Sequence, residues 1–315
     1  MRKNILLLLI SIFTLPLCLF SQTDILGFHP DQTDPSQMSV VYKKERDAKR
    51  EYIHLAPLRE ADVLWSRKIW RDIDLRQKIN HPLYYPQETE AETVDRDNLF
   101  KVLYDAATYR SEISITAYAN PEKDDEFKNP MEAAELINLI EGVEQELFML
   151  NMFGEDSLDI NGEPIPLETD LRKGAINLAD IKKYRLKEQW FFDKQRSVMD
   201  VWIIGICPIA MDRHPEGHPQ EYELTGGERP LFWFYFPEAR KVLRNAQSFN
   251  LVKNEAENRT FEDIFLKRMF SSTIVKEGNV YDRKVNQYMV GLDALLEAER
   301  IKTEIFNIEH DLWEY

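Results

Sequence analysis

Cysteine is scarce in this sequence, which has only Cys18 and Cys207 among its 315 residues. We expect Cys18 to leave with an N-terminal segment described below, so Cys207 has no partner for an intramolecular disulfide bond. A chain of this length can bury a core that is large enough to fold without one. Cys207 lies in the apolar run 201–209, where a thiol packs as a small hydrophobic group and stays unreactive. The sequence therefore predicts a buried and inert cysteine.

Glycine is also scarce, at 11 residues, and the glycine-rich loops that bind phosphate groups are missing. The sequence likewise contains no helix motif with paired zinc-binding histidines, no nucleophile elbow and no Cys-x-x-Cys pair. Carboxylates such as Glu141, Glu144 and Glu146 are best explained as a hydrated helix face. We predict that the chain is not an enzyme and has neither catalytic residues nor a cofactor.

Positive charge is in short supply, since 40 lysine and arginine residues stand against 55 acidic ones and give a net charge of −15. Nucleic acids and anionic lipid headgroups bind positive patches, so neither is expected as a partner. After the first 21 residues no apolar run approaches the length of a membrane span, and we expect no direct membrane insertion. With 43% hydrophobic residues, the chain can nevertheless bury a substantial core.

The first 21 residues have the layout of a secretory signal peptide. Arg2 and Lys3 precede an apolar run, and Ser21 supplies the small residue at which cleavage is expected. A lipoprotein signal ending at Cys18 is the alternative, but it requires a small residue where the bulky Leu17 stands. We therefore predict that residues 1–21 are removed and that the mature protein acts outside the cytoplasm.

The chain that follows begins with two parts of different character. Residues 22–55 are predicted to form an extended arm, because prolines, aspartates and a charged run at 43–47 disfavour regular structure. Residues 56–156 are predicted to form a mainly helical lobe. Apolar residues at spacings of three and four place its helices at 57 to about 73, 98–110 and 130–154.

Residues 157–315 are predicted to form an α+β lobe. Alternation at 186–192 and an apolar run at 198–209 predict two strands joined by a hairpin. Shorter strands are expected at 113–118, 231–236 and 271–275, and helices at 238–246 and 260–269. A long amphipathic C-terminal helix that closes the protein's own core is predicted from the seam Ala294, Ala298, Ile301, Ile305, Ile308 and Leu312. The predicted fold class is α+β, with a helical N-terminal half, a mixed portion of antiparallel sheet and helices, and a long C-terminal helix.

Three short motifs could bind an ion or carry a sugar, and each has a simpler structural explanation. The segment from Ser157 to Glu168 partly matches the spacing of a calcium loop, but Asn161-Gly162 within it also forms a two-residue hairpin turn, which we favour. His214 and His218 could hold a divalent metal, although the prolines and glycine around them are typical of a surface turn. Asn258 begins a glycosylation sequon and could equally cap the helix that follows.

Several longer strings carry a specific resemblance. They lie at 59–70 (READVLWSRKIW), 82–86 (PLYYP), 231–237 (LFWFYFP), 279–283 (NVYDR) and 310–315 (HDLWEY). In these strings the chain resembles the gliding-motility protein family GldN, called PorN in non-gliding bacteria. The resemblance covers most of the chain beyond residue 57 and is weakest before residue 55 and at 120–129.

The resemblance implies a periplasmic component of the type IX secretion system of Bacteroidota, with no catalytic residues or cofactors. Members of that family assemble with the lipoprotein GldK or PorK into rings beneath the outer membrane, and the rings connect to the GldL–GldM motor through the periplasmic part of GldM. It therefore implies self-association, GldK/PorK and GldM as partners, and peripheral attachment to the inner face of the outer membrane through the lipoprotein.

We predict a structural subunit that buries surface against copies of itself and a lipoprotein. Aromatic side chains concentrate binding energy at interfaces, with about 2 kcal/mol or more for each hot spot. The candidate interface residues lie on the first predicted helix, the tyrosine pair and the terminal helix: Trp65, Trp70, Tyr84, Tyr85, Ile301, Ile305 and Trp313. Two alternatives stay open, namely a secreted ligand- or metal-binding protein or hydrolase that uses the His214–His218 loop, and a chaperone-like adaptor for exported substrates.

Overall fold

The computed structural model describes residues 51–87, 96–119, 121, 125–141, 176–213, 224–249 and 259–313. Side chains are described throughout these ranges except at 212–213, 224–226 and 312–313. The chain divides into two compact units, residues 1–49 and 50–315, and everything described below belongs to the second. The predicted signal peptide, most of the predicted arm, the Ser157–Glu168 segment, the His214–His218 loop and Asn258 lie outside the described residues.

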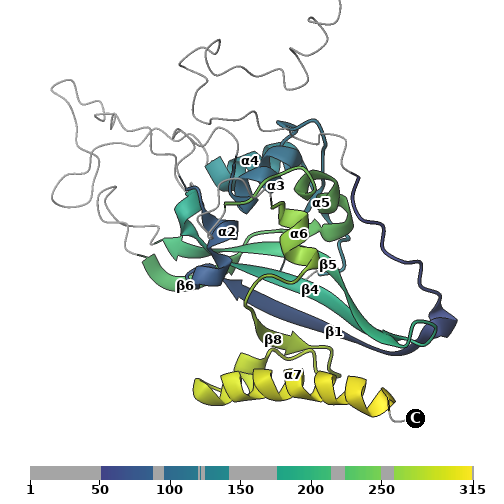
Figure 1. Ribbon diagram of the computed structural model, residues 1–315. Helices are drawn as coiled ribbons and strands as arrows, with labels where there is room; N and C mark the ends of the chain where they lie inside the picture. Colours follow the sequence, from purple (N-terminus) through teal and green to yellow (C-terminus); the bar gives the residue numbers. More distant parts are fainter. Residues whose placement is uncertain are drawn as a thin grey trace, which may run out of the picture. The chain divides into compact units, whose positions relative to one another are not determined.

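An antiparallel sheet forms the centre of the second unit (Figure 1). Its strands are β1 (Val63–Asp74), β2 (Ala117–Tyr118), β3 (Pro130–Met131), β4 (Ile181–Asp193), β5 (Val198–Arg213), β6 (Leu224–Pro230), β7 (Trp233–Tyr235) and β8 (Thr273–Glu277). The strand order is β3-β2-β7-β5-β4-β1-β8, and β6 pairs with β5. Every pairing is antiparallel.

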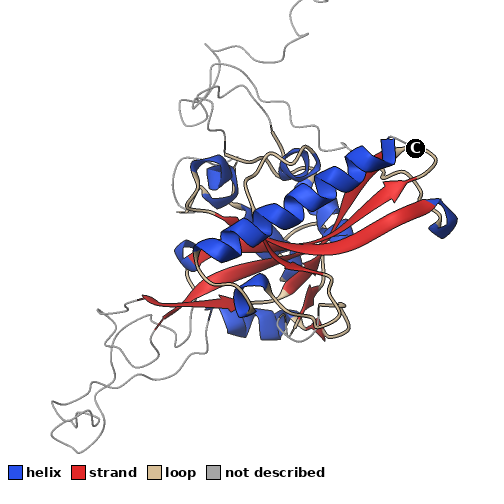
Figure 2. Cartoon of the chain, turned by 90° about the horizontal axis from the view of Figure 1, so that it is seen from below, coloured by secondary structure: helices blue, strands red, loops and turns tan. Residues whose placement is uncertain are grey.

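Helices pack against this sheet in two groups. They are α2 (His81–Tyr84), α3 (Leu99–Ala107), α4 (Ala133–Glu141), α5 (Phe236–Leu243), α6 (Phe261–Leu266) and α7 (Leu292–Trp313). In the view of Figure 1, α2 to α6 lie above β1, β4 and β5, whereas β8 and α7 lie below these strands. Seen from below, α7 runs obliquely across the strands (Figure 2). The fold is α+β with an antiparallel sheet and a long C-terminal helix, as predicted, but the described part of the N-terminal half begins with a strand and combines strands with helices.

The segment expected to be the first helix is a strand, and this prediction was wrong. Trp65, Ile69 and Ile73 are four residues apart, which places them on one face of a helix and equally on one face of a strand, because four is a multiple of two. The β-branched and aromatic residues of 63–74 favour the strand. β1 pairs with β4 along its whole length and with β8 from Ile69 to Asp72, and this pairing makes the segment a strand and not a helix.

Other elements follow the predicted pattern closely. β4 and β5 form the expected hairpin, with a turn at 194–197. α3 begins after Asn98, whose side chain accepts a hydrogen bond of 2.7 Å from the Lys101 N–H, as N-cap residues do. The N-cap of α6 is Thr260, which forms a capping box with Asp263, whereas Asn258 lies outside the described residues. α4 starts close to the predicted position and is described as far as Glu141.

Two large hydrophobic clusters pack against the sheet. The larger lies against α2 to α6, and its members include Ile73, Tyr184, Leu186, Ile206, Leu99, Leu103, Phe232, Phe234, Phe236, Phe261 and Phe265. The smaller lies against α7 and contains Ile69, Ile274, Val285, Ala298, Ile301 and Ile305. The inward seam predicted for the terminal helix is therefore confirmed at Ala298, Ile301 and Ile305.

Cys207 is fully buried in a third small cluster with Trp70 and Trp233. The predicted burial is therefore confirmed, and burial raises the pKa of the thiol to about 12. None of the helices in the described part of the chain is long and apolar enough to cross a membrane.

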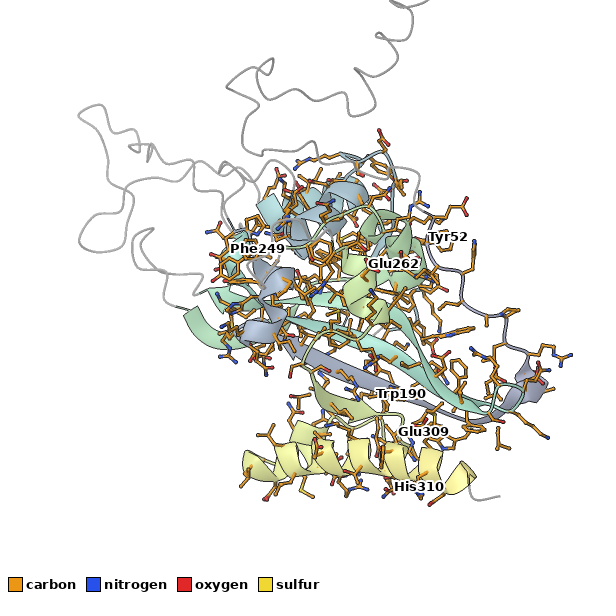
Figure 3. All side chains as sticks on the ribbon, in the orientation of Figure 1. Tyr52, Trp190, Phe249, Glu262, Glu309 and His310 are labelled. Carbon is orange, nitrogen blue, oxygen red and sulfur yellow. The ribbon has the colours of Figure 1, made fainter. Side chains whose placement is uncertain are left out.

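The buried carboxylate of Glu188 joins the sheet to the segment after α6. Arg268 donates to its Oε1 at 2.9 Å, the Arg71 Nε lies 3.3 Å from its Oε2, and the indole N–H of Trp190 donates to that same oxygen at 2.9 Å. Trp190 lies between the sheet and α7 (Figure 3). A buried carboxylate needs such partners, because an uncompensated charge in the interior is costly.

Candidate protein-docking surface

Exposed apolar side chains gather at the start of α7 and in the segment before it. We call this surface the 280–296 patch, and it comprises Val280, Tyr281, Tyr288, Met289, Val290, Leu292, Leu295 and Leu296. Val280 is 98% exposed and Val290 82% exposed. Isolated exposed apolar residues are normal on protein surfaces, whereas a group of this kind marks an interaction site.

Helix α7 has two apolar faces with different roles. Ala298, Ile301 and Ile305 point to the sheet and are buried. Leu292, Leu295 and Leu296 lie in the first turns of the same helix and remain exposed, with Leu296 at 60%. The buried face holds the helix against the sheet. The exposed leucines therefore lie on a helix whose position is fixed by its own packing.

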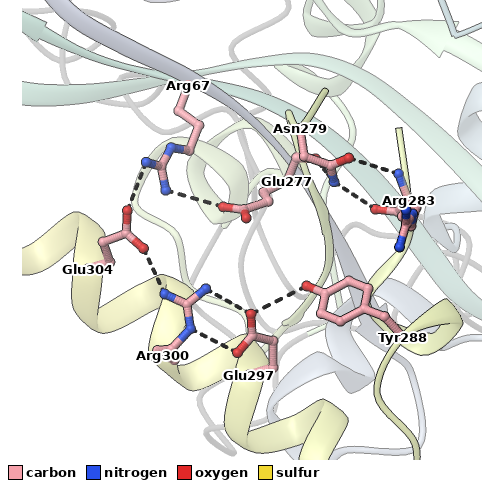
Figure 4. Close-up of polar contacts among 8 residues, drawn as sticks. All are labelled: Arg67, Glu277, Asn279, Arg283, Tyr288, Glu297, Arg300 and Glu304. Carbon is pink, nitrogen blue, oxygen red and sulfur yellow. Dashed lines mark hydrogen bonds and ion pairs between the residues drawn. The ribbon is translucent and has the colours of Figure 1, made fainter. Parts of the chain in front are cut away.

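Ionic hydrogen bonds also hold α7 against the sheet (Figure 4). Arg67 of β1 donates to Glu304 at 2.9 Å and to Glu277 of β8 at 3.2 Å. Glu304 also accepts from Arg300 at 3.0 Å, and Arg300 makes two hydrogen bonds of 2.8 Å with Glu297. These contacts form a continuous chain from the sheet to the helix that carries the patch.

The same chain reaches the segment before α7. The hydroxyl of Tyr288 donates to Glu297 at 3.4 Å. Asn279 closes a tight turn, because its side chain donates to the Arg283 carbonyl at 2.9 Å and accepts from the Arg283 N–H at 3.0 Å. Val280 and Tyr281 lie at the tip of this turn, so their exposure follows from a hydrogen-bonded loop geometry.

The titration of these carboxyls follows from their partners. The hydrogen bond from Arg67 lowers the pKa of Glu304, and that from Arg300 lowers the pKa of Glu297. Removal from solvent and the neighbouring Glu297 carboxylate raise the pKa of Tyr288. All of these groups therefore keep their usual charge state at neutral pH, which is the state in which the network forms.

A cavity of about 350 Å³ opens between the sheet and the patch. Its walls include Lys183 and Arg185 of β4, Lys284, and Leu295 of the patch. Arg185 pairs with Asp72 at 2.7 Å and Lys183 with Glu228 at 2.5 Å. Paired charges beside an apolar surface resemble the polar rim that surrounds the apolar centre of protein interfaces.

The structure buries three of the seven predicted interface residues, Trp70, Ile301 and Ile305, and leaves Trp65 half-buried. Trp65 is half-buried beside the α7 cluster, with the Arg67 guanidinium 5.5 Å from its ring centre. Trp70 is buried, and the Lys276 ammonium lies 4.3 Å from its ring centre. Ile301 and Ile305 are buried beneath α7, so the structure brings these two together with Trp65 in one cluster.

The remaining predicted interface residues lie elsewhere. Tyr84 is half-buried, donates to the Ala179 carbonyl at 3.3 Å and accepts from Lys182 at 2.8 Å. Tyr85 is 38% exposed and packs edge-on against Tyr84. Trp313 is the last residue of α7, and its side chain lies outside the described part. Among the seven, Tyr85 is therefore the described side chain that is free to contact a partner.

Sequence reasoning missed the 280–296 patch, although one signal was present. The seam that predicted the terminal helix uses Ala294, Ala298, Ile301 and Ile305. Leu292, Leu295 and Leu296 are also apolar, but they do not belong to that seam. Apolar residues that exceed what one buried face requires are a sign of a second contact surface.

Among the residues that the structure describes, no group of three or more His, Cys, Asp or Glu side chains could hold a metal ion. The two motifs for which an ion was considered, Ser157–Glu168 and His214–His218, lie outside the described part, so they stay hypotheses.

Comparison with known proteins agrees with the resemblance noted in the sequence. A family model described as "Gliding motility associated protein GldN" matches residues 58–314, a range that runs from before β1 to the end of α7. A comparison with curated proteins gave no match. The family match makes the chain a component of the gliding-motility and type IX secretion machinery. Because that match spans most of the sequence, the chain belongs to the GldN family of gliding motility associated proteins.

Proposed function

We propose that this chain is exported to the periplasm and serves as a non-catalytic structural subunit of the type IX secretion and gliding machinery. In this proposal it forms a ring with the outer-membrane lipoprotein GldK or PorK, which holds it at the inner face of the outer membrane, and it couples the ring to the GldL–GldM motor. Family membership and the signal-peptide layout of residues 1–21 support the proposal.

The observation that carries the proposal is the 280–296 patch. Eight large apolar side chains on one helix end and its preceding loop are costly to leave in water. Permanent assemblies bury surfaces that are more apolar than those of transient complexes. We assign this patch to the lipoprotein, because a ring that is held at the membrane by this partner needs a stable contact with it.

The ring adds a second requirement. A heterologous contact, in which two different surfaces of the same subunit meet, propagates around a closed circle. The patch is one surface, so copies of the chain must meet through others. Tyr85 is an exposed aromatic residue away from the patch and is proposed for one of those contacts.

Co-purification tests the proposal directly. The variant V280S/L292S/L296S keeps the buried face of α7 and removes three exposed apolar side chains. We expect it to fold, to lose binding of the lipoprotein, and to abolish gliding or type IX secretion in cells. Y109S is the matched control, because Tyr109 is also well exposed and lies after α3, away from the patch. Full binding by the triple variant would contradict the assignment of the patch.

A further inference from the structure

Two cavities adjoin each other beside β8. The larger, of about 350 Å³, lies between the sheet and the 280–296 patch, and the smaller has a volume of about 70 Å³. Arg185, Val275 and Lys284 line both of them, so the two cavities form one groove, which we call the Lys284 groove. Leu295 of the patch lines the larger cavity, and the indole ring of Trp70 lines the smaller. The groove therefore begins at the patch and extends along the sheet.

Two lysine residues lie directly opposite each other on the wall of this groove. Lys276 of β8 and Lys284 form an isolated antiparallel bridge, and residues paired in this way project to the same face. The turn between them is held by Asn279, whose side chain bonds the backbone of Arg283 in both directions (Figure 4). Like charges at opposite positions are destabilising. An arrangement that costs stability is expected where it serves a function.

Each carboxylate on the groove walls is already engaged by a cation. The pairs are Asp72 with Arg185, Asp125 with Lys187, Glu228 with Lys183, and Asp282 with Lys276. Lys284 also lines the walls, and among the residues that the structure describes its ammonium has no ion pair and no hydrogen bond. The residue is half-buried, so its charge is partly removed from water without a counter-charge. Such a group favours the binding of an anion.

The neighbouring lysine adds to this positive potential. Lys276 pairs with Asp282 at 2.6 Å, but the Asp282 side chain is 80% exposed, and an ion pair with so exposed a partner is strongly screened by water. The Lys276 ammonium also lies 4.3 Å from the ring centre of Trp70. The groove therefore combines incompletely neutralised positive charge with an aromatic wall, within a chain whose net charge is −15.

We propose that the Lys284 groove binds an aspartate or glutamate side chain of the protein that docks on the 280–296 patch, with Lys284 as its counter-charge. The volume of the larger cavity lies in the range of ligand-binding clefts. Leu295 belongs to both the patch and the groove, so a segment that covers the patch can place its next side chain in the groove. This inference rests on the proposed function and names the chemistry of its partner.

The charge of the chain favours a different protein over a second copy. Each copy carries a net charge of −15, and two such molecules repel each other over the whole surface. An acidic segment of another protein meets the unpaired lysine without that penalty if the rest of the partner is less acidic. The docking segment is therefore expected to combine apolar residues for the patch with at least one carboxylate for the groove.

Zero-length cross-linking of the isolated complex tests the proposal. A carbodiimide joins an amine to a carboxylate that it touches, and peptide mass spectrometry identifies the two residues. We expect an amide bond between Lys284 and an aspartate or glutamate of the lipoprotein. Lys241, an exposed lysine of α5, is the matched control and should form no such bond with the lipoprotein. A complex that is cross-linked through other residues but not through Lys284 would overturn the proposal, and so would a bond from Lys284 to a second copy.

Substitutions at Lys284 provide a second measurement. K284M keeps the length of the side chain without its charge, and K284R keeps the charge. We expect K284M to weaken lipoprotein binding about tenfold and to reduce its dependence on salt, whereas K284R and the control K241M should stay within about twofold. The Tm of free K284M should not fall, because the substitution removes a like-charge pair. A lower Tm with unchanged binding would assign Lys284 a structural role and end the inference.

The two proposals fail in different ways. V280S/L292S/L296S tests the patch, and K284M tests the groove. Loss of binding by the triple variant together with normal binding by K284M would end this inference and leave the proposed function intact. Normal binding by the triple variant would contradict the proposed function itself.

Discussion

The two faces of α7 predict two separable effects of shortening a side chain. Ile301 is fully buried between the helix and the sheet, whereas Leu296 is 60% exposed on the patch. I301A removes three carbons, worth about 0.8 kcal/mol each by transfer, and leaves a cavity. Buried aliphatic-to-alanine changes cost about 2–5 kcal/mol, so we expect about 3 kcal/mol. L296A removes atoms that water already contacts, and we expect a change of at most about 0.5 kcal/mol.

Thermal and urea unfolding of the mature protein measure both effects. For a unit of this size, about 3 kcal/mol corresponds to a fall in Tm of about 6–12 °C, and L296A should stay within about 2 °C of the unmodified protein. Tryptophan fluorescence is a suitable signal, because Trp65 and Trp190 pack against the cluster that contains Ile301. L296A should bind the lipoprotein more weakly than I301A does, when binding is measured below the melting temperatures of both variants. Equal destabilisation by the two variants would show that Leu296 is buried in solution and refute the reasoning.

Four further predictions concern other parts of the fold. E188A should destabilise the protein by about 3 kcal/mol or more in urea unfolding, because it leaves two arginines without their buried counter-charge; a change below about 1 kcal/mol would contradict this. N98A should cost about 1 kcal/mol through loss of the α3 cap, and N98S should recover most of it. The pKa of Glu304 is lowered in the fold, so its ion pairs stabilise the protein above the ordinary glutamate pKa. This stabilisation is lost as the pH falls through the lowered pKa. E304Q should therefore lose less stability than the unmodified protein between about pH 6 and pH 3. Cys207 should resist thiol reagents in the native protein and react fully in urea, and rapid native labelling would contradict its burial.

The sequence predicted those elements whose pattern has a single interpretation. β4 contains the alternating stretch 186–192, β5 contains the apolar run 198–209, and the seam of α7 follows helical spacing for many residues. These three elements were therefore predicted correctly. Residues 63–74 combine apolar spacings of four with charged residues between them, and local pattern cannot separate a strand from a helix there. The pairing of β1 with β4, more than a hundred residues away in sequence, decides its conformation, and such long-range pairing is not encoded locally.

The candidate surface was predicted by element but not by residue. The terminal helix was correctly chosen as important, yet Ile301 and Ile305 turn toward the sheet, while Leu292 and Leu296 face solvent. The sheet and the 284–288 segment cover only some of the apolar residues of α7. Which residues they cover depends on where β8 and that segment end, and these end points are set by the tertiary structure. Trp70 shows the same limit, because its burial depends on Cys207 and Trp233 from strands that follow far along the chain.

Protection of the 280–296 patch in the assembled complex is the most direct test of a docking role. V290C places a thiol at a position that is 82% exposed in the free chain, and the native Cys207 is buried. A bulky maleimide should label V290C rapidly in the purified protein and at least about tenfold more slowly in the ring isolated with its lipoprotein. Equal labelling in both states would contradict the claim that this protein works by burying that surface against a partner.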